Sequence, residues 1–532
     1  MTGNQMTSEL SRISVMARRA VQSQDWATVD ACANEILRQD ETSAEGYFLA
    51  GIVQRVSKKP AKARRAFEKA LAMDADRYDA AIELANQYTI ARRNADAAAL
   101  VARYEEALSN SPMYLDLAGT VYNDIGMSQE AWPLYKKAVE LQPGVDLFQA
   151  NLAACGVYLG KIEEAKAIYR TLLERFPNHR QNHYQLSRLD KAKDSTHVEQ
   201  MKEILRTSDD PPDRNVFMYY AIGKELEDLE QWEESFEYYK KAGDAVTSVA
   251  TYDVAADIEL IDKIIEVCNA EWLASENGRF TTDDADKTPI FIVGLPRTGT
   301  TLTERIVSSH SQVESIGETQ FLQMVLRRES GVHSVDSMNP AMIEAVAQID
   351  IGTVARGYLD TVRYRLGDEP MFVDKLPFNF LFLGFIAKAY PDAMIIHLRR
   401  NPMDACFSMY KQVFTWAYKF SYSLDGLGQY YVAHDRLRNH WREVLKDRMI
   451  EVAYESLVTD QERQTRILLD KMGLEFEQAC LDFDKNKAPS ATASSVQVRE
   501  KVHTRSINKW TRFAKHLQPL KEHLESAGIS LE

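Results

Sequence analysis

The sequence predicts a multidomain protein: an amino-terminal all-α array of helical repeats, followed by an α/β domain built around a central parallel sheet. Three observations predict this fold class. A phrase of small and aromatic residues recurs at an offset of 34 residues in the first half. Short apolar runs typical of buried strands begin only after about residue 288. The first of these runs leads directly into a glycine-bearing loop of the kind that binds phosphate groups.

The length and composition indicate two or more globular domains. The chain has 532 residues, of which 45% are hydrophobic and 27% are charged. A net charge of −14 disfavours nucleic acid as a general partner. The five cysteines are scattered, so neither a disulfide framework nor a zinc site is indicated. No signal peptide and no membrane span are visible, and we expect a cytoplasmic protein.

Residues 12–250 are expected to form the helical repeats. The clearest phrase contains Ala131, Tyr135 and Pro143, and its copy 34 residues later contains Ala165, Tyr169 and Pro177. The small residues let two helices approach closely, the aromatic ring fills the space between hairpins, and proline ends the second helix. This phrase resembles the tetratricopeptide repeat, whose period is 34 residues. The resemblance implies five or six repeats with a concave face that holds a protein or peptide, whereas an unrelated helical bundle is the alternative.

The second half begins after a change in composition. Residues 251–287 are expected to form a connecting helix and a linker, because the stretch 275–287 is rich in polar turn formers. Residues 288–532 are expected to form the second domain. Its strand-like runs are separated by helical patterns, which predicts a parallel sheet buried on both faces. The runs are residues 289–293, 371–373, 393–398 and 450–453.

The first run is followed by a candidate phosphate loop. Gly294 and Gly299 have the Gly-x-x-x-x-Gly spacing of a P-loop, and a helical pattern follows. The next residue is Thr300, where a nucleotide triphosphatase needs lysine, and the cation comes earlier, at Arg297. This displacement indicates a phosphate ligand other than a triphosphate. A tight turn without a ligand is the alternative interpretation of the loop alone.

The residues from Pro296 to Leu302 resemble the loop that binds the 5′-phosphosulfate in sulfotransferases, and in particular in the tyrosylprotein sulfotransferases. Further motifs of that family follow in the same order, and together they cover about residues 288–515. They are His310 with Gly317 and Glu318; Asp374, Lys375 and Pro377; Arg400 with Ser408 eight residues later; Tyr454; and Ser494, Ser495, Gln497 and Val498 with the later Lys509 and Trp510.

The resemblance implies a role for each matched residue. Glu318 matches the position of the family's catalytic base. Lys375 and Arg297 would stabilise the transferring group and the leaving oxygen, and Ser494 would add a further hydrogen-bond donor. Arg400 and Ser408 would hold a 3′-phosphate. The residues implied in binding the donor are Arg297, Thr298, Gly299, Thr300, Thr301, Arg400, Ser408, Tyr454, Ser495, Gln497, Val498 and Lys509. No metal is expected.

The function implied is transfer of a sulfuryl group from 3′-phosphoadenosine 5′-phosphosulfate (PAPS) to a hydroxyl acceptor, with adenosine 3′,5′-bisphosphate as the product. The acceptor could be a protein tyrosine presented by the repeats. Gln412, with Lys411 beside it, stands where the tyrosylprotein enzymes have an arginine, so carbohydrate, lipid and small alcohols stay open. The alternatives are a non-enzymatic repeat scaffold with a nucleotide-sensing domain, or a P-loop kinase of small nucleotides.

Overall fold

The computed structural model describes residues 3–275, 287–334, 338–414, 417–492 and 494–531. The chain forms two compact units, Met1–Ile168 and Tyr169–Glu532. Of the predicted polar linker, residues 276–286 lie outside the described part of the chain. Among the described residues, no helix combines the length and the apolar character needed to cross a membrane.

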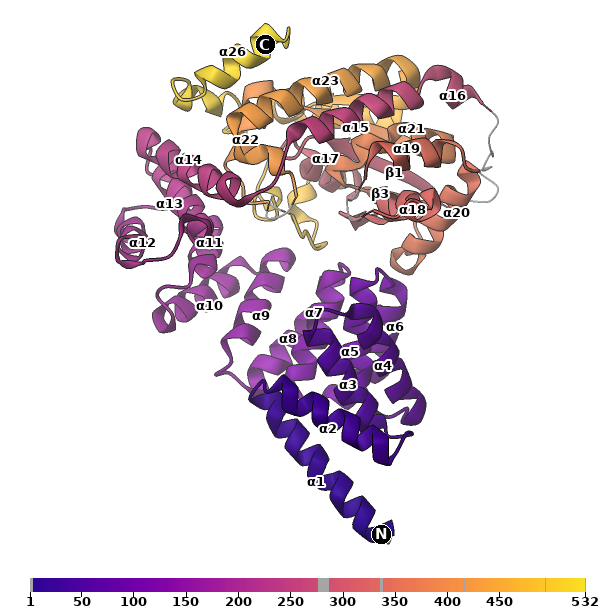
Figure 1. The fold of residues 1–532 in the computed structure, drawn as a ribbon. Helices are drawn as coiled ribbons and strands as arrows, with labels where there is room; N and C mark the ends of the chain where they lie inside the picture. Colours follow the sequence, from indigo (N-terminus) through magenta and orange to yellow (C-terminus); the bar gives the residue numbers. More distant parts are fainter. Residues whose placement is uncertain (1–2, 276–286, 335–337, 415–416, 493, 532) are drawn as a thin grey trace. The chain divides into compact units, whose positions relative to one another are not determined.

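The first unit consists of helices (Figure 1). α3 packs with α4, α5 with α6 and α7 with α8, as antiparallel hairpins. The helices that open successive repeats begin at intervals of 34 residues, which confirms the period found in the sequence. These helices are α3, α5, α7, α9 and α11. The bounds are α1 (Gly3–Gln22), α2 (Trp26–Gln39), α3 (Ala44–Val56), α4 (Pro60–Met73), α5 (Tyr78–Ile90), α6 (Asn94–Tyr104), α7 (Pro112–Asp124), α8 (Ser128–Leu141) and α9 (Asp146–Leu159), with α10 (Ile162–Arg175) crossing into the second unit.

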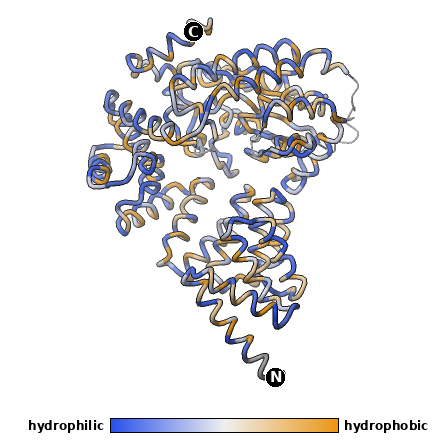
Figure 2. The backbone as a smooth tube through the Cα atoms, in the orientation of Figure 1, coloured by the Kyte–Doolittle hydropathy of each residue, from blue (hydrophilic) through white to orange (hydrophobic). Residues whose placement is uncertain are grey.

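In the α3–α4 and α7–α8 hairpins, an aromatic ring of the second helix lies against a glycine of the first helix. A Cβ on Gly51 would lie 2.4 Å from the Phe67 ring, and a Cβ on Gly119 would lie 3.0 Å from the Tyr135 ring. Ala131 and Tyr135 are both buried, as the repeated phrase predicts. Hydrophobic and hydrophilic residues alternate along these helices (Figure 2), as expected where each helix buries one side against its neighbours.

The second unit begins with the last helices of the repeat array. The helix α13 packs against both α11 and α14, and α15 packs against α19 and α23 of the following domain. A Cβ on Gly223 would lie 2.8 Å from the Tyr239 ring, so α13 and α14 repeat the glycine–aromatic contact of the earlier hairpins. The bounds are α11 (Arg180–Leu189), α12 (Thr196–Thr207), α13 (Val216–Asp228), α14 (Trp232–Val249), α15 (Val254–Val267) and α16 (Ala270–Ala274).

The rest of the second unit is built on a five-stranded sheet in which every neighbouring pair of strands is parallel. The strand order is β2-β3-β1-β4-β5, so β1 is central. The four predicted strands are confirmed as β1 (Thr288–Gly294), β3 (Met371–Asp374), β4 (Met394–Arg399) and β5 (Met449–Ala453). The edge strand β2 (Val313–Gly317) was not predicted. Its buried residues, Val313 and Ile316, are three positions apart instead of two, which gives a weak strand signal.

Both faces of the sheet are apolar and covered by helices (Figure 1). Ile290 and Ile292 of β1 pack with α17, α24 and α25, whereas Phe291 and Val293 belong to a second core with α18 to α23. This period of two explains why β1 reads as a continuous apolar run. The bounds are α17 (Thr300–Val307), α18 (Phe321–Ser330), α19 (Pro340–Ala347), α20 (Ile351–Val362), α21 (Leu383–Ala389), α22 (Pro402–Tyr410), α23 (Leu424–Leu445), α24 (Tyr454–Thr459), α25 (Gln461–Lys471) and α26 (Gln518–Ser526).

Candidate functional site

The candidate site lies at the carboxyl edge of the sheet, because each strand ends beside a residue singled out in the sequence. In parallel α/β sheets this edge is where ligands bind, at the point where the strand order reverses. That point lies at β1, whose neighbours on either side are β3 and β4. The residues that follow the strands are Arg297 after β1, Glu318 after β2, Lys375 after β3, Arg400 after β4 and Tyr454 after β5.

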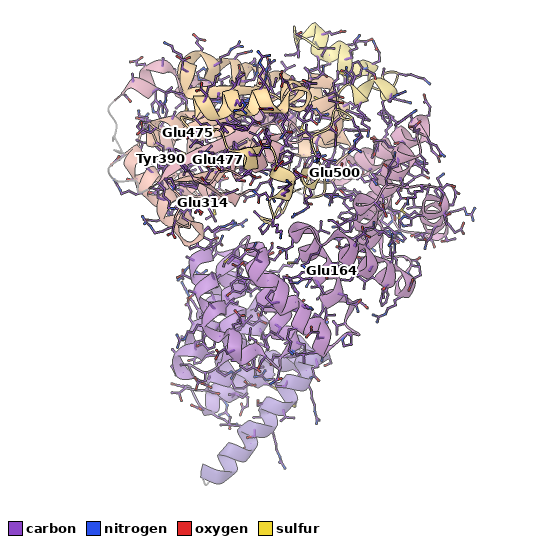
Figure 3. The ribbon with its side chains drawn as sticks, turned by 180° about the vertical axis from the view of Figure 1, so that it is seen from behind. Glu164, Glu314, Tyr390, Glu475, Glu477 and Glu500 are labelled. Carbon is purple, nitrogen blue, oxygen red and sulfur yellow. The ribbon has the colours of Figure 1, made fainter. Side chains whose placement is uncertain are left out.

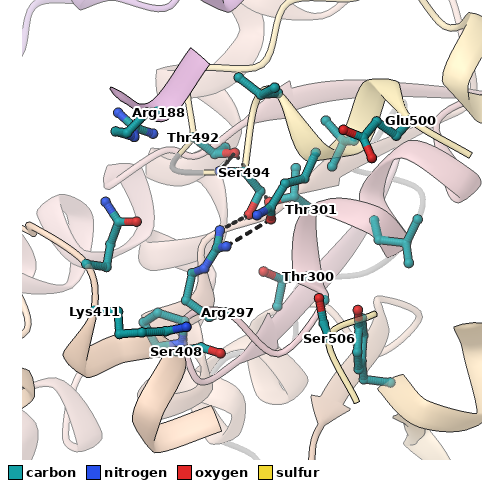
Figure 4. Close-up of a pocket in the computed structure, with 18 of the residues that line it drawn as sticks. Arg188, Arg297, Thr300, Thr301, Ser408, Lys411, Thr492, Ser494, Glu500 and Ser506 are labelled. Atoms are coloured by element: carbon teal, nitrogen blue, oxygen red, sulfur yellow. Dashed lines mark hydrogen bonds between the residues drawn. The ribbon is translucent and has the colours of Figure 1, made fainter. Parts of the chain in front are cut away.

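A cavity of about 730 Å³ opens at this edge (Figure 4). Its volume falls in the range of nucleotide and small-molecule sites, roughly 300–1,000 Å³. Three predicted residues, Thr298, Lys375 and Ser495, are buried just outside the lining. The others line the cavity together: Arg297, Gly299, Thr300, Thr301, Glu318, Arg400, Ser408, Tyr454, Ser494, Gln497, Val498 and Lys509.

The loop after β1 has the backbone of an anion-binding turn. Gly294, Arg297 and Gly299 all have positive φ, of 144°, 67° and 100°. Glycine is required at both ends, because a Cβ on Gly294 would lie 2.6 Å from the carbonyl oxygen of Leu398 and one on Gly299 would lie 2.7 Å from the Tyr454 ring. Helix α17 starts immediately after the loop, so its first backbone N–H groups face the same cavity as Thr300.

Arg297 is held across the cavity by the carboxy-terminal segment. Its guanidinium donates to the hydroxyl of Ser494 and, over 2.9 Å, to the side-chain oxygen of Gln497 (Figure 4). Burial and the nearby cations Arg400 and Arg188 lower the pKa of Arg297 to about 10. A cluster of positive groups that costs free energy in this way is relieved by a bound anion.

Arg400 and Ser408 form the second half of the site. The Arg400 guanidinium donates to the backbone oxygen of Arg297 at 2.9 Å, to the Ser408 hydroxyl at 3.3 Å and to the Ser506 carbonyl at 2.5 Å. Its guanidinium carbon lies over the Tyr454 ring, 4.7 Å from the ring centre. The eight-residue interval from Arg400 to Ser408 thus places the serine on α22 within reach of the arginine, as the sequence motif implies.

Glu318 and Lys375 are joined at the other end of the cavity. Lys375 has no exposed side-chain surface; it donates a hydrogen bond to Glu318 and lies 3.5 Å from Glu304 of α17. Burial alone would lower the pKa of Lys375, but the two carboxylates outweigh it and raise the pKa above its usual value. Glu318 keeps 34% of its side chain exposed, so its carboxylate is accessible from the cavity.

Two buried aspartates support these side chains. Asp374, next to Lys375, accepts hydrogen bonds from Tyr358 at 2.7 Å and Thr319 at 2.9 Å. Asp404 of α22 accepts the backbone N–H groups of Asn508 and Trp510, at 2.6 Å and 3.0 Å. Asp404 therefore fixes the turn that carries Lys509 against the helix that carries Ser408.

The structure adds residues that sequence reasoning did not assign. Arg188 of α11 and Glu227 of α13 line the same cavity although they belong to the helical repeats. Lys411, which the sequence marks as a departure from the tyrosylprotein pattern, lines the cavity and binds Glu227 over 2.9 Å. Glu304 contacts Lys375. A charged residue on an amphipathic helix normally faces solvent, so no signal in the sequence identifies Arg188 or Glu227.

The wall beside Glu318 is apolar and aromatic. Pro377, Phe414 and Tyr418 line the cavity there, and the rings of Phe414 and Tyr418 meet edge to face at 4.8 Å. Burial and the Glu318 carboxylate raise the pKa of Tyr418 above its ordinary value. The cavity is therefore cationic toward Arg297 and Arg400 and aromatic toward Glu318.

Two protein families match the chain. The family described as "Sulfotransferase family" matches residues 289–478, and "Tetratricopeptide repeat" matches residues 148–179. An uncharacterized protein of Aquifex aeolicus is 30% identical over 428 residues, which is 79% of this chain and 56% of that protein. The protein-tyrosine sulfotransferase of Drosophila melanogaster is 23% identical over 269 residues, 49% of this chain and 54% of that protein.

The chain thus spans only about half the length of these two relatives. A solved structure, the sulfotransferase domain from the curacin biosynthetic pathway, is 15% identical with a TM-score of 0.28, covering 44% of this chain and 98% of that one. The two family matches lie in the helical part and in the α/β part of the fold: the repeat match in the former and the sulfotransferase match in the latter. This chain therefore contains a segment that matches the tetratricopeptide repeat and a carboxy-terminal region that matches the sulfotransferase family.

Proposed function

We propose that the domain transfers a sulfuryl group from PAPS to a hydroxyl acceptor. The observation that carries this proposal is the convergence of Arg297, Arg400, Lys375 and Glu318 from the carboxyl ends of four parallel strands around one cavity. A donor with a 5′-phosphosulfate and a 3′-phosphate needs cations at two separated points, and the Arg297 loop and the Arg400–Ser408 pair supply them. The matched sulfotransferase family supports the same reaction class.

The residues divide the chemistry between binding and reaction. Arg400 and Ser408 would hold the 3′-phosphate, while the loop from Arg297 to Thr301 would hold the 5′-phosphosulfate. The acceptor oxygen would form the new S–O bond as its proton passes to Glu318. The bond from sulfur to the bridging oxygen would break, and its electron pair would remain on the 5′-phosphate. Lys375 and Arg297 would stabilise that developing negative charge.

The aromatic wall supports a phenolic acceptor. Phe414 and Tyr418 offer ring faces and edges beside Glu318, and a phenol ring packs against such surfaces better than a polar sugar does. The protein-tyrosine sulfotransferases among the relatives act on such a hydroxyl, as their name states. We therefore rank a tyrosine-like phenol above carbohydrate, lipid and small aliphatic alcohols, and the helical repeats would bind the protein that carries it.

The decisive experiment is calorimetric binding of adenosine 3′,5′-bisphosphate followed by transfer of labelled sulfur from PAPS. Saturable binding and transfer to a tyrosine peptide are expected. Binding without transfer to any acceptor would favour a nucleotide-sensing scaffold, and magnesium-dependent ATP turnover with indifference to PAPS would favour a kinase. Equal transfer to a tyrosine peptide and to an aliphatic alcohol would contradict the phenolic preference.

A further inference from the structure

The last helices of the repeat array and the sulfotransferase-family domain share one hydrophobic core. Phe236 of α14 stacks on Tyr410 and on His516, with ring centres 6.1 Å and 4.3 Å apart. Trp232 meets Phe513 edge to face at 5.6 Å. Tyr220 of α13 belongs to the same buried core and donates a hydrogen bond to the backbone of Tyr410. These helices therefore pack as part of the domain that carries the cavity.

The polar centre of this junction is Glu227, near the end of α13. Its side chain is only 7% exposed, and its two oxygens accept from the amine of Lys411 at 2.9 Å each. The amine of Lys509 lies 2.5 Å away, and the Tyr239 hydroxyl donates over 3.0 Å. Burial would raise the pKa of Glu227, but the two lysines lower it well below its usual value. A buried carboxylate with this many donors is ionised and fixed.

Both lysines are connected to helix α22. Lys411 follows α22, the helix that carries Ser408, and Figure 4 shows the two side by side. Lys509 sits on the turn that Asp404 of the same helix anchors. Glu227, Lys411 and Lys509 all line the cavity with Arg400. A repeat residue thus holds two cations at the end of the cavity assigned to the 3′-phosphate.

We propose that Glu227 is a positioning residue of the donor site, through which the last helical hairpins hold the amines of Lys411 and Lys509 beside the bound nucleotide. This inference rests on the proposed function, because it assumes a nucleotide with a 3′-phosphate in this cavity. The repeats then contribute to donor binding as well as to any contact with a protein acceptor.

The electrostatic surroundings of Lys411 explain why the carboxylate is needed. Burial and the neighbouring cations Lys509 and Arg400 lower the pKa of Lys411 to about 8, while Glu227 opposes them. The other groups packed around the amine are the Phe407 and Phe513 rings and, through Glu227, the Tyr239 hydroxyl. Without the Glu227 charge the pKa of Lys411 falls further, so near neutral pH the amine loses its proton and the phosphate must bind with proton uptake.

The test is calorimetric binding of adenosine 3′,5′-bisphosphate to the full chain and to E227Q between pH 6.5 and 8.5. For the unchanged protein, affinity should stay level at neutral pH and fall above about pH 8. For E227Q the fall should begin at lower pH, with affinity near pH 8 reduced about tenfold, the equivalent of one pKa unit. Titration in two buffers of different ionisation enthalpy should reveal greater proton uptake in E227Q.

The matched control is E233Q, which removes an exposed carboxylate of α14 that pairs with His516 across the same junction. Its nucleotide affinity and pH profile should equal those of the unchanged protein. The double variant E227Q/K411R carries a cation that keeps its proton, so its affinity should stay level over the whole pH range. If E227Q does not fold, E227D serves instead, and a smaller shift of the same sign is expected.

The outcomes separate the two proposals. Absence of binding to the unchanged chain overturns the proposed function itself. Normal binding by the unchanged chain, with an identical pH profile in folded E227Q or E227D, overturns the role of Glu227 alone. Tighter binding of nucleotide by E227Q at every pH would mean that the carboxylate competes with the phosphate, and would also overturn it.

Discussion

Lys375 is completely buried and donates a hydrogen bond to the carboxylate of Glu318. The lysine follows β3 and the glutamate follows β2, two strands that are neighbours in the sheet. The sheet therefore sets the distance between the proposed base and a proposed stabiliser of the leaving oxygen. Because the backbone N–H of Lys375 also binds the carbonyl of Gly317 over 3.0 Å, the pairing does not depend on the side chains alone.

The substitution Glu318→Gln should abolish most sulfuryl transfer while leaving nucleotide binding intact. The amide cannot accept the proton of the acceptor hydroxyl, and general-base catalysis contributes roughly 10²- to 10⁴-fold. We expect kcat to fall by that factor, measured with labelled PAPS at saturating acceptor, and the dissociation constant of adenosine 3′,5′-bisphosphate to change little.

The control for this substitution is Glu314→Gln, on the strand β2 that precedes Glu318. Glu314, labelled in Figure 3, pairs with Lys287 over 2.9 Å and accepts the backbone N–H of Gly367, and it is not among the residues that line the cavity. Its transfer rate should stay near that of the unchanged protein. If Glu318→Gln also kept its rate, another group would have to be the base.

The substitution Arg400→Ala should weaken nucleotide binding. It removes the guanidinium that donates to the Ser408 hydroxyl and to the Arg297 backbone. Hydrogen bonds to charged groups contribute about 1.5–3 kcal/mol, or roughly 10- to 100-fold in affinity. The neighbouring Arg399→Ala is the matched control, because Arg399 is exposed at the end of β4. Calorimetry should give an affinity within about twofold for the control. An equal loss of nucleotide affinity in both variants would mean that Arg400 acts through the overall positive charge and makes no specific contact with the nucleotide.

The sequence predicts the central strands and the order of the site residues well, for physical reasons. β1 is apolar on both faces, and its loop must contain glycine where Gly294 and Gly299 allow close contacts. The edge strand β2 escapes prediction because Val313 and Ile316 are its fully buried residues, with polar residues between them. The motif that contains Glu318 still locates the end of that strand.

The contribution of the repeats to the site could not be predicted. Glu227 reads as a surface carboxylate of an amphipathic helix, and only packing of α13 and α14 against the second domain buries it. Arg188, in the last turn of α11, likewise has the sequence pattern of a surface residue. The departure from the tyrosylprotein pattern at Lys411 and Gln412 is the sign of this contribution that the sequence does contain. Lys411 binds Glu227, and Gln412 donates to Tyr184 over 2.9 Å. A single sequence does not reveal such long-range pairs.

The substitution Gly299→Ala should damage both stability and nucleotide binding. A Cβ there would lie 2.7 Å from the Tyr454 ring, and the backbone has φ of 100°. The control is Gly331→Ala, with φ of 66° but no atom within 4 Å of the new Cβ. We expect the control to cost about 1 kcal/mol in free energy of unfolding and to bind nucleotide normally. Gly299→Ala should cost more and lose affinity, as measured by denaturation and calorimetry. Equal effects would show that the ring contact is unimportant.

The substitution Asp374→Asn should change how stability depends on pH. Burial raises the pKa of Asp374 from 3.8 to about 7, although the hydrogen bonds from Tyr358 and Thr319 act in the opposite direction. Between these two values the unfolded chain loses the proton before the folded chain does, so the unchanged protein loses stability as pH rises from about 4 to 7. Asparagine does not titrate, and its oxygen can still accept from Tyr358. The melting temperature of the variant relative to the unchanged protein should therefore rise over this window and level off above it.

A second variant tests the cause of that window. Tyr358→Phe removes a hydrogen bond to the ionised carboxylate, which should raise the pKa of Asp374 further and extend the loss of stability to higher pH. Asn379 lies 3.4 Å from the same carboxylate, and its own side-chain oxygen has no partner among the described residues, so it can turn to accept the new N–H of the Asp374→Asn side chain. Thermal unfolding of the three proteins from pH 4 to 8 gives the comparison. A constant difference between Asp374→Asn and the unchanged protein would mean that Asp374 is ionised in the folded state throughout, and that Lys375 is then balanced by three carboxylates.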